Sequence, residues 1–296
     1  MLTVAAFYRF TRLVPEVCRT PLLAALEAAG ARGTVLLAPE GVNGTLALPP
    51  EAVPAARAAL RALPGCADLD WTESRVDTPP FRRLKVRTKP EIVTMGAPDL
   101  DPARTGTYVP PEEWNALIAR DDVAVIDTRN AYEVRIGRFD GAIDPGTDRF
   151  RDFPAWWASR PDLDGRPIAM YCTGGIRCEK ASAFLLEAGV RDVFHLEGGI
   201  LKYLETVPAS ESRWRGGCFV FDDRVSVGHD LTPDGHILCH GCRRPLTTAE
   251  THGSDYEPGV SCFQCKDQIS GDRQAGFRER QRQVNLAQAR GISHLA

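Results

Sequence analysis

The chain has 296 residues, of which 43% are hydrophobic and 25% charged, and its formal net charge is -3. This composition is typical of a globular protein with room for about two domains, and the charge excludes a general polyanion binder, so any nucleic-acid surface must be local. No apolar run approaches the ~20 residues that span a bilayer, and the first residues lack a signal-peptide pattern. We therefore expect a cytoplasmic protein that does not bind membranes; the sequence does not define its oligomeric state.

The chain contains nine cysteines, an odd number. In a protein without an export signal, free thiols, a thiolate and metal ligands are expected rather than a disulfide framework. Two of the cysteines flank a glycine-containing loop in the middle of the chain, and four form two C-x-x-C pairs near its end.

Residues 1–95 are predicted to form a small α+β domain with the element order β-α-β-β-α-β, which is that of a ferredoxin-like fold. Both predicted helices end at a glycine or a Pro-Gly pair, as helices commonly do. The predicted strands cover 4–10, 33–38, 44–48, 69–72 and 83–89, and the predicted helices cover 20–29 and 51–63.

The last of these strands carries an unusual row of charge. Side chains two apart share one face of a strand, so its four basic residues line up on one side. They are Arg83, Lys85, Arg87 and Lys89. A solvated edge strand protected against aggregation is one explanation, and a track for RNA phosphates is the other, which we favour.

Residues 96–110 are rich in proline and are predicted to be an extended linker. In residues 111–210, short apolar strands at 123–126, 168–171 and 193–196 alternate with helical patterns. That alternation predicts a parallel sheet with helices on both faces, which binds ligands at the carboxyl ends of its strands.

The second of these strands ends at Cys172, and a loop then leads into a helix. The loop residues are Thr173, Gly174, Gly175, Ile176 and Arg177. The glycines let the loop curl so that its amides point at one sulfur, and a helix N-terminus lies behind it. Both features favour a thiolate over a thiol, so the pattern predicts a nucleophile cradle.

Residues 214–296 form a cysteine-rich region with a predicted hairpin at 218–227. Two C-x-x-C knuckles follow, with spacing suited to a tetrahedral structural Zn²⁺ site. Their cysteines are Cys239, Cys242, Cys262 and Cys265. We expect His240, inside the first knuckle, to point to solvent. The tail from 272 to 290 is arginine-rich and weakly helical, and a frayed, solvated terminus is expected there, with an RNA-contacting arm as the open alternative.

The central loop resembles the active-site loop of rhodanese domains, in which a cysteine carries a persulfide. Flanking pieces at 125–129, 132–133, 137–142 and 195–200 resemble the same domain. Phosphatases built on this fold have a longer loop, because it must hold a phosphate, so the short loop disfavours a phosphatase.

Over nearly the whole chain, the segment 38–45, the central loop and the cysteine-rich end together resemble the oxygen-dependent tRNA uridine(34) hydroxylases. The resemblance implies conversion of the wobble uridine in the tRNA anticodon loop to 5-hydroxyuridine, with O₂ as co-substrate and an unidentified reductant. It also places the persulfide-type cysteine at Cys172.

Cys172 is the favoured nucleophile, because the loop amides converge on it. Cys178, in the first turn of the helix, is the alternative and a neighbouring thiol able to close a reversible disulfide. Arg177 is expected to steady the loop or an anionic intermediate, with a surface salt bridge as its plainer role. A thiolate that adds to uracil C6 makes C5 electron-rich enough to reduce O₂. Neither a dinucleotide fingerprint nor a two-His-one-carboxylate cluster is present, so no nucleotide, flavin or iron cofactor is predicted.

Two rival functions remain open on the sequence. A sulfurtransferase would move sulfane sulfur to a thiol or RNA acceptor with the same loop. A non-enzymatic adaptor would bind RNA through the knuckles and the basic strand. Salt-sensitive tRNA binding would argue against simple sulfur transfer, and turnover that depends on Cys172 would exclude the adaptor.

Overall fold

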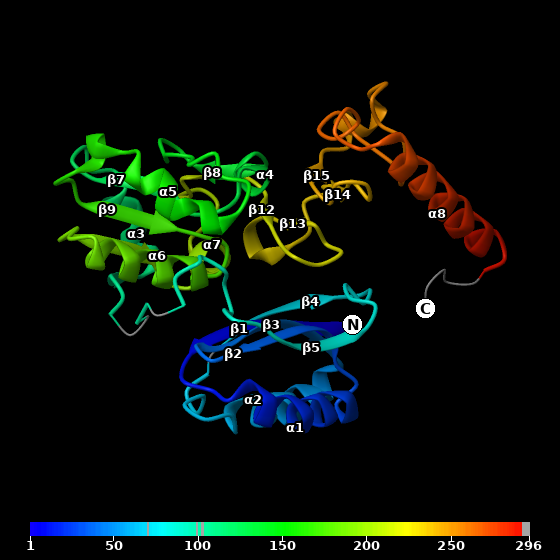
Figure 1. Cartoon of the computed structure of the whole chain (residues 1–296), viewed down its shortest axis with the longest axis horizontal. Helices are drawn as coiled ribbons and strands as arrows, with labels where there is room; N and C mark the ends of the chain where they lie inside the picture. The colour runs from blue at the N-terminus through cyan, green and yellow to red at the C-terminus, as the bar shows by residue number, and fades with distance from the viewer. Residues whose placement is uncertain (70, 99, 102–103, 292–296) are drawn as a thin grey trace. The chain divides into compact units, whose positions relative to one another are not determined.

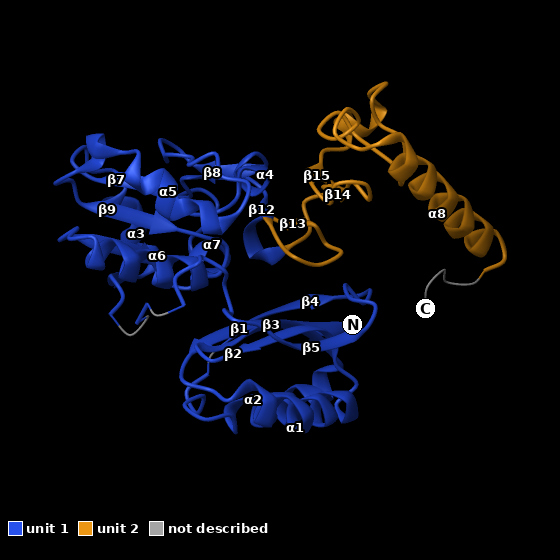
Figure 2. Ribbon diagram, viewed as in Figure 1, with its two compact units in different colours: residues 1–218, 228–231 blue, residues 219–227, 232–296 orange. Residues whose placement is uncertain are grey.

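The computed structural model describes residues 1–69, 71–98, 100–101 and 104–291. The chain divides into two compact units (Figure 2). The first unit comprises residues 1–218 and 228–231, and the second comprises residues 219–227 and 232–296. Every helix among the described residues is too short or too polar to cross a lipid bilayer.

The N-terminal part of the first unit is a five-stranded sheet with two helices packed on one face (Figure 1). The strand order is β4-β1-β3-β2-β5, in which only β5 runs parallel to its neighbour. The elements are β1 (Leu2–Phe10), α1 (Pro15–Ala28), β2 (Arg32–Ala38), β3 (Gly41–Leu48), η1 (Pro50–Ala52), α2 (Val53–Arg61), β4 (Trp71–Val76) and β5 (Leu84–Thr88). The first four strands and two helices have the predicted ferredoxin-like order, and β5 adds a fifth strand at the edge.

The two faces of this sheet differ because side chains alternate along each strand. Val35, Leu37 and Val86 pack with Leu26 of α1 and Leu60 of α2 in one apolar core. The residues between them therefore lie on the opposite face, which the two helices leave uncovered.

Three predicted boundaries shift in the structure. α1 begins at Pro15 rather than Thr20, since proline suits the first turn of a helix. β3 begins at Gly41 rather than at the predicted residue 44, because residues 41–43 pair with the end of β1. The strand predicted at 69–72 begins at Trp71, and Asp70 lies outside the described residues.

The central part of the first unit is a parallel sheet of order β6-β10-β9-β7. This confirms the predicted α/β architecture. The elements are β6 (Thr107–Val109), α3 (Pro111–Leu117), β7 (Ala124–Asp127), α4 (Ala131–Val134), β8 (Gly137–Phe139), η2 (Phe150–Asp152), α5 (Phe153–Ala158), η3 (Pro161–Leu163), β9 (Ile168–Tyr171), α6 (Ile176–Glu187), β10 (Val193–Leu196), α7 (Gly199–Thr206) and β11 (Trp214–Gly216), which pairs with β8.

Each face of the parallel sheet is buried against helices. On one face, Ile126 and Met170 pack with Phe153 of α5 and Leu185 of α6. On the other face, Tyr171 begins a cluster of aromatic rings with centroids 4.8 to 6.3 Å apart. Its members are Trp114, Phe139, Tyr171, Tyr203 and Trp214. Burial on both faces explains the continuous apolar runs of these strands.

The end of the predicted 96–110 linker is part of the domain that follows. Thr107–Val109 form β6, which pairs in parallel with β10 at the edge of the central sheet. A three-residue strand is too short to show a periodic pattern, and the prolines around it are typical of a linker. Residues 99, 102 and 103 of this segment lie outside the described residues.

The second unit holds short strand pairs and a long helix. The predicted hairpin is present as β12 (Cys218–Phe219) paired with β13 (Ser226–Val227), although β12 begins in the first unit. A second pair joins β14 (Ile237–Leu238) to β15 (Pro245–Leu246). Short helices lie at η4 (His229–Leu231, in the first unit) and η5 (Ala249–His252).

The arginine-rich tail differs from the expected frayed terminus, because it forms the continuous helix α8 (Gly271–Ala289). Two of its arginines tie it to the knuckle region. Arg278 binds Glu257 through two contacts of 2.7 Å, and Arg280 donates to the carbonyls of His240 and Gly259 at 3.1 and 2.8 Å. These side-chain contacts hold the helix without an apolar stripe, so the hydrophobic pattern gave no sign of them.

Candidate active site and metal centre

The Cys172 loop connects the carboxyl end of β9 to the first turn of α6. Cys172 itself is fully buried. Gly175 caps α6 with a φ of 99°, a conformation that favours glycine, and its backbone N–H donates to Cys172 Sγ at 3.1 Å. The predicted cradle is therefore present, with an amide and a helix N-terminus directed at one sulfur.

A second helix N-terminus holds the loop from its carbonyl side. The N–H groups of Ile200 and Leu201 in α7 donate to the carbonyls of Cys172 and Thr173 at 2.9 and 3.0 Å. Gly199 allows this approach, since a Cβ there would lie 2.5 Å from the Cys172 carbonyl oxygen. The loop backbone is thus fixed at both ends by helices.

The electrostatic surroundings of Cys172 favour its thiolate. Burial alone raises the pKa of this thiol, but a hydrogen bond from the Cys178 thiol, the charge of Arg177 and the backbone N–H groups of both residues together lower it to about 6. The net effect of burial and these interactions favours an ionised Cys172 sulfur at neutral pH.

Cys178 has the opposite character. Burial and the neighbouring Cys172 sulfur raise the pKa of the Cys178 thiol well above its ordinary value. Its Sγ also lies 3.4 Å from Thr128 Oγ1. Within this coupled pair, Cys172 ionises first and Cys178 stays a thiol that donates to it.

Arg177 forms a buried ion pair, which excludes the alternative of a surface salt bridge. Its guanidinium binds both carboxylate oxygens of Glu133 at 2.7 and 2.8 Å, and the Glu133 side chain is fully buried. Glu133 also accepts from the Asn130 N–H at 3.1 Å and from Thr173 Oγ1 at 3.4 Å. This carboxylate joins the loop to α4, and no local sequence pattern indicates the pairing.

The N-terminal sheet also contacts α6, through residues that no sequence pattern had indicated. The hydroxyl of Tyr8 in β1 donates to Glu179 Oε1 at 2.7 Å. Lys180 is fully buried, and its Nζ lies 2.7 Å from Glu40 Oε2 and 2.6 Å from Glu91 Oε1. The position of Glu40 in a tight turn was visible in the sequence, but its partner lies 140 residues away.

The basic strand lies at the edge of the N-terminal sheet, on the face that the helices leave uncovered. Arg83, Arg87 and Lys89 are exposed and Lys85 is half-buried. Among the described residues, none of the four forms an ion pair. Register places Arg87 opposite Leu36, Leu36 opposite Asn43, and Asn43 opposite Tyr8. One row across the sheet thus runs from the basic strand to the tyrosine that contacts α6.

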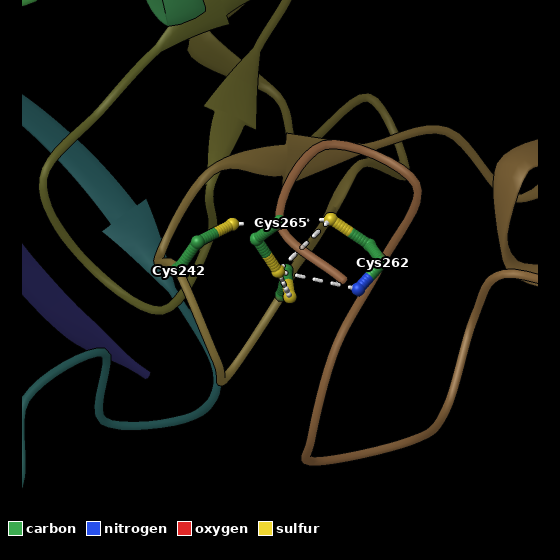
Figure 3. Close-up of side chains that lie close together, drawn as sticks. Cys242, Cys262 and Cys265 are labelled. Carbon is green, nitrogen blue, oxygen red and sulfur yellow. Dashed lines mark hydrogen bonds between the residues drawn. The ribbon is translucent and has the colours of Figure 1, made fainter. Parts of the chain in front are cut away.

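The four knuckle cysteines converge in the second unit (Figure 3). Their sulfur atoms lie within 4.8 Å of one another, with 3.8 Å between Cys242 and Cys262 and 3.9 Å between Cys239 and Cys265. Four sulfurs at the usual Zn–S distance of about 2.3 Å from one tetrahedral ion would be about 3.8 Å apart. The donor set and its spacing therefore fit Zn²⁺. His240 is exposed, as expected.

Comparisons with known proteins match both parts of the first unit. Residues 2–92 match the UPF0176 acylphosphatase like domain, and residues 110–206 match the rhodanese-like domain. The chain is 57% identical to a protein of Jannaschia sp. (strain CCS1), with 100% of this chain and 99% of the relative covered. It is 58% identical to a protein of Ruegeria pomeroyi over 100% of this chain and 99% of the relative.

A third relative, from Caulobacter vibrioides, is 53% identical over 99% of this chain and 96% of its own length. All three relatives are named tRNA uridine(34) hydroxylase. The match at this level covers 99–100% of this chain, so it extends over both units. The chain belongs to the tRNA uridine(34) hydroxylase family.

Proposed function

We propose that this protein hydroxylates C5 of uridine 34 in tRNA, with O₂ and a two-electron reductant as co-substrates and Cys172 as the nucleophile. Family membership supports the substrate and the reaction. The observation that carries the role of Cys172 is the Gly175 N–H at 3.1 Å from its sulfur, together with the lowered pKa of the thiol. The thiolate is the reactive form of cysteine.

The proposed reaction begins when the Cys172 thiolate forms a bond to uracil C6 and the C5–C6 π pair moves toward O4. The resulting enolate reduces O₂ at C5 and gives a C5 hydroperoxide. The reductant supplies two electrons, and with two protons the outer oxygen leaves as water. Loss of the C5 proton then restores the C5–C6 double bond as the C6–S bond breaks, which returns the electron pair to Cys172.

The RNA is proposed to lie on the uncovered face of the N-terminal sheet. Arg83, Lys85, Arg87 and Lys89 would contact phosphates there, since repulsion within this basic row is relieved by an anionic partner. Uridine 34 must leave its stack to reach the buried thiolate, which a single-stranded anticodon loop permits at low cost.

A sulfurtransferase is the second candidate, because the same loop geometry supports it. Amides and a helix N-terminus directed at one sulfur would also stabilise the outer sulfur of a Cys172 persulfide. The two activities differ in product: one adds oxygen to uracil C5, and the other moves sulfane sulfur to an acceptor.

The experiment incubates purified protein with unmodified tRNA, O₂ and a thiol reductant, and measures 5-hydroxyuridine by nucleoside mass spectrometry. We expect Cys172→Ser to abolish the product and Cys178→Ser to retain it. Cys18→Ser, in the N-terminal core, is the matched control for cysteine loss. Full activity in Cys172→Ser protein would refute the mechanism. Sulfur transfer to tRNA without hydroxylation would select the second candidate.

The RNA track is tested with the Lys85→Gln, Arg87→Gln double variant. Loss of two phosphate contacts should weaken tRNA binding and reduce the slope of log K against log salt by about 1.4, at ~0.7 per contact for single strands. An unchanged slope would leave the edge-protection role as the explanation of this strand.

A further inference from the structure

A carboxyl group lies beside the Cys172 loop and is not used in the steps above. Glu179 follows Cys178 on α6 and is half-buried. Its Oε1 accepts a hydrogen bond from the Tyr8 hydroxyl at 2.7 Å, and the Tyr108 phenol also acts on the carboxyl and lowers its pKa. Two phenols from two different sheets, in β1 and in β6, thus converge on one carboxyl.

The inner end of this group touches the loop. The Tyr8 hydroxyl is packed so closely against Gly175 that a Cβ there would lie 2.6 Å from the phenol oxygen. The N–H of the same glycine is 3.1 Å from Cys172 Sγ. Charge on Cys172 correspondingly acts on Tyr8 and helps to raise the pKa of that phenol.

The outer end reaches solvent, because Tyr108 is 43% exposed. Tyr8 and Glu179 therefore form a hydrogen-bonded pair beside the loop, and Tyr108 acts on the same carboxyl from the surface of the first unit. Hydroxyl and carboxyl groups both donate and accept protons, so such a pair can carry a proton in either direction.

The surroundings favour a carboxyl that changes its protonation state. Burial raises the pKa of Glu179, whereas the two phenols and the charge of Arg9 lower it, and burial prevails. The charged groups that act on the phenols are Cys172 on Tyr8, and Arg9 and Glu197 on Tyr108. A raised carboxyl pKa is the usual adjustment for general acid–base catalysis near neutral pH.

We propose that Glu179 is the proton-transfer group of the uridine hydroxylation and that it exchanges protons with the bound uracil through Tyr8. This inference rests on the proposed function. As the thiolate adds to C6, the Glu179 carboxyl donates a proton through Tyr8 to the developing enolate at O4 and is left ionised. When C5 bonds to O₂, the C4 carbonyl is restored and the O4 proton passes to the peroxide oxygen, which completes the hydroperoxide. As the C6–S bond breaks, the Glu179 carboxylate takes up the proton that leaves C5, which restores the carboxyl.

The role predicts a partial reaction that needs no O₂. In anaerobic D₂O, the thiolate adds to C6 and Glu179 deuterates O4 through Tyr8. The enol then takes a deuteron at C5 from solvent and loses its O4 deuteron to solvent. The Glu179 carboxylate removes the original C5 hydrogen as the C6–S bond breaks, which releases 5-deuterated uridine 34. The measurement is nucleoside mass spectrometry of tRNA after incubation with the full-length protein. Wild-type protein should catalyse this exchange, and Cys172→Ser should not.

Glu179→Gln is expected to lower the exchange and aerobic hydroxylation together by roughly 10²-fold or more, the typical contribution of a positioned acid or base. Tyr8→Phe keeps the ring and removes only the hydroxyl, so it should lower both rates without loss of folding. Glu187→Gln is the matched control, because Glu187 is exposed at the far end of the same helix. It should leave both rates unchanged.

A purely structural role of Glu179 would alter the loop instead of the proton step. The pH dependence of Cys172 alkylation by iodoacetamide, followed by peptide mass spectrometry, reports on the loop and should be unchanged in Glu179→Gln and Tyr8→Phe. Wild-type exchange rates in either variant, or an alkylation profile shifted in proportion to the lost activity, would overturn the proposal. If the wild-type protein shows no hydroxylation, or if its hydroxylation does not depend on Cys172, the proposed function itself is overturned.

Discussion

The chain gathers cysteines in two places and treats their charge in opposite ways. At the loop, one sulfur is surrounded by groups of the protein that stabilise negative charge, namely the Gly175 N–H, the α6 N-terminus and Arg177. In the knuckles, four sulfurs lie within 4.8 Å of one another. Four thiolates this close repel one another unless a cation lies between them.

The difference separates a reactive cysteine from a structural one. A sulfur whose charge is balanced by the protein remains free to attack a substrate, whereas sulfurs balanced by an ion are committed to that ion. The same residue type therefore predicts chemistry at the loop and folding stability at the knuckles. Four experiments test this contrast.

The largest effect is expected at the knuckles. Cys262→Ser should abolish zinc binding and destabilise the second unit by about 10 kcal/mol, the lower end of structural zinc affinities. Metal analysis and hydrogen exchange of the second unit provide the measurement. Alkylation of Cys172 should proceed as in wild type, and Cys18→Ser should keep the metal. Retention of stoichiometric zinc by the Cys262→Ser protein would break the contrast.

The next largest effect is expected from the Glu133 carboxylate, which balances the charge of Arg177. Glu133→Gln leaves the Arg177 guanidinium buried without its carboxylate and should cost about 3–5 kcal/mol in the free energy of unfolding. Chemical denaturation measures this loss. Glu197→Gln breaks an exposed pair with Lys202 in the same domain and should cost less than about 1 kcal/mol. Equal losses in the two variants would contradict the assignment of Glu133 as the support of the loop.

A smaller effect is expected from the neighbouring thiol. Cys178→Ala removes a donor that lowers the pKa of Cys172, so the midpoint of Cys172 alkylation should rise from about pH 6 by roughly one unit. The sign follows because a thiol with a lowered pKa loses its reactive form only as the pH falls through that value. An unchanged midpoint would show that the amides and Arg177 suffice.

The smallest effect is expected from the histidine inside the first knuckle. His240 is exposed, and the four sulfurs already complete a tetrahedral set. His240→Ala should therefore bind the same amount of zinc and change the free energy of unfolding by less than about 0.5 kcal/mol. Loss of zinc in this variant would make His240 a ligand and remove one of the cysteines from the set.

The sequence predicted the features that depend on local patterns. Alternating apolar strands, the glycine loop after Cys172 and the C-x-x-C spacing are each encoded within a few residues, and the structure contains all of them.

The features that the sequence did not predict depend on contacts between segments that are far apart in the chain. Glu133 pairs with Arg177 across 44 residues, and Tyr8 reaches Glu179 across 171. Periodicity and spacing describe neighbours along the chain, so they cannot specify such partners. The continuous helix α8 was not predicted for a related reason, since arginine contacts rather than an apolar stripe hold it in place.

The first turn of α6 presents three consecutive side chains to three different partners: Cys178 to the nucleophile, Glu179 to the tyrosines and Lys180 to two carboxylates. Successive positions on a helix are about 100° apart, so each residue points in its own direction. Inserting or deleting one residue there would rotate all three away from their partners at once. Residues in this turn can accordingly be substituted, but none can be inserted or deleted without loss of these contacts. Another protein that received the Cys172 loop alone would lack the partners of Glu179 and Lys180.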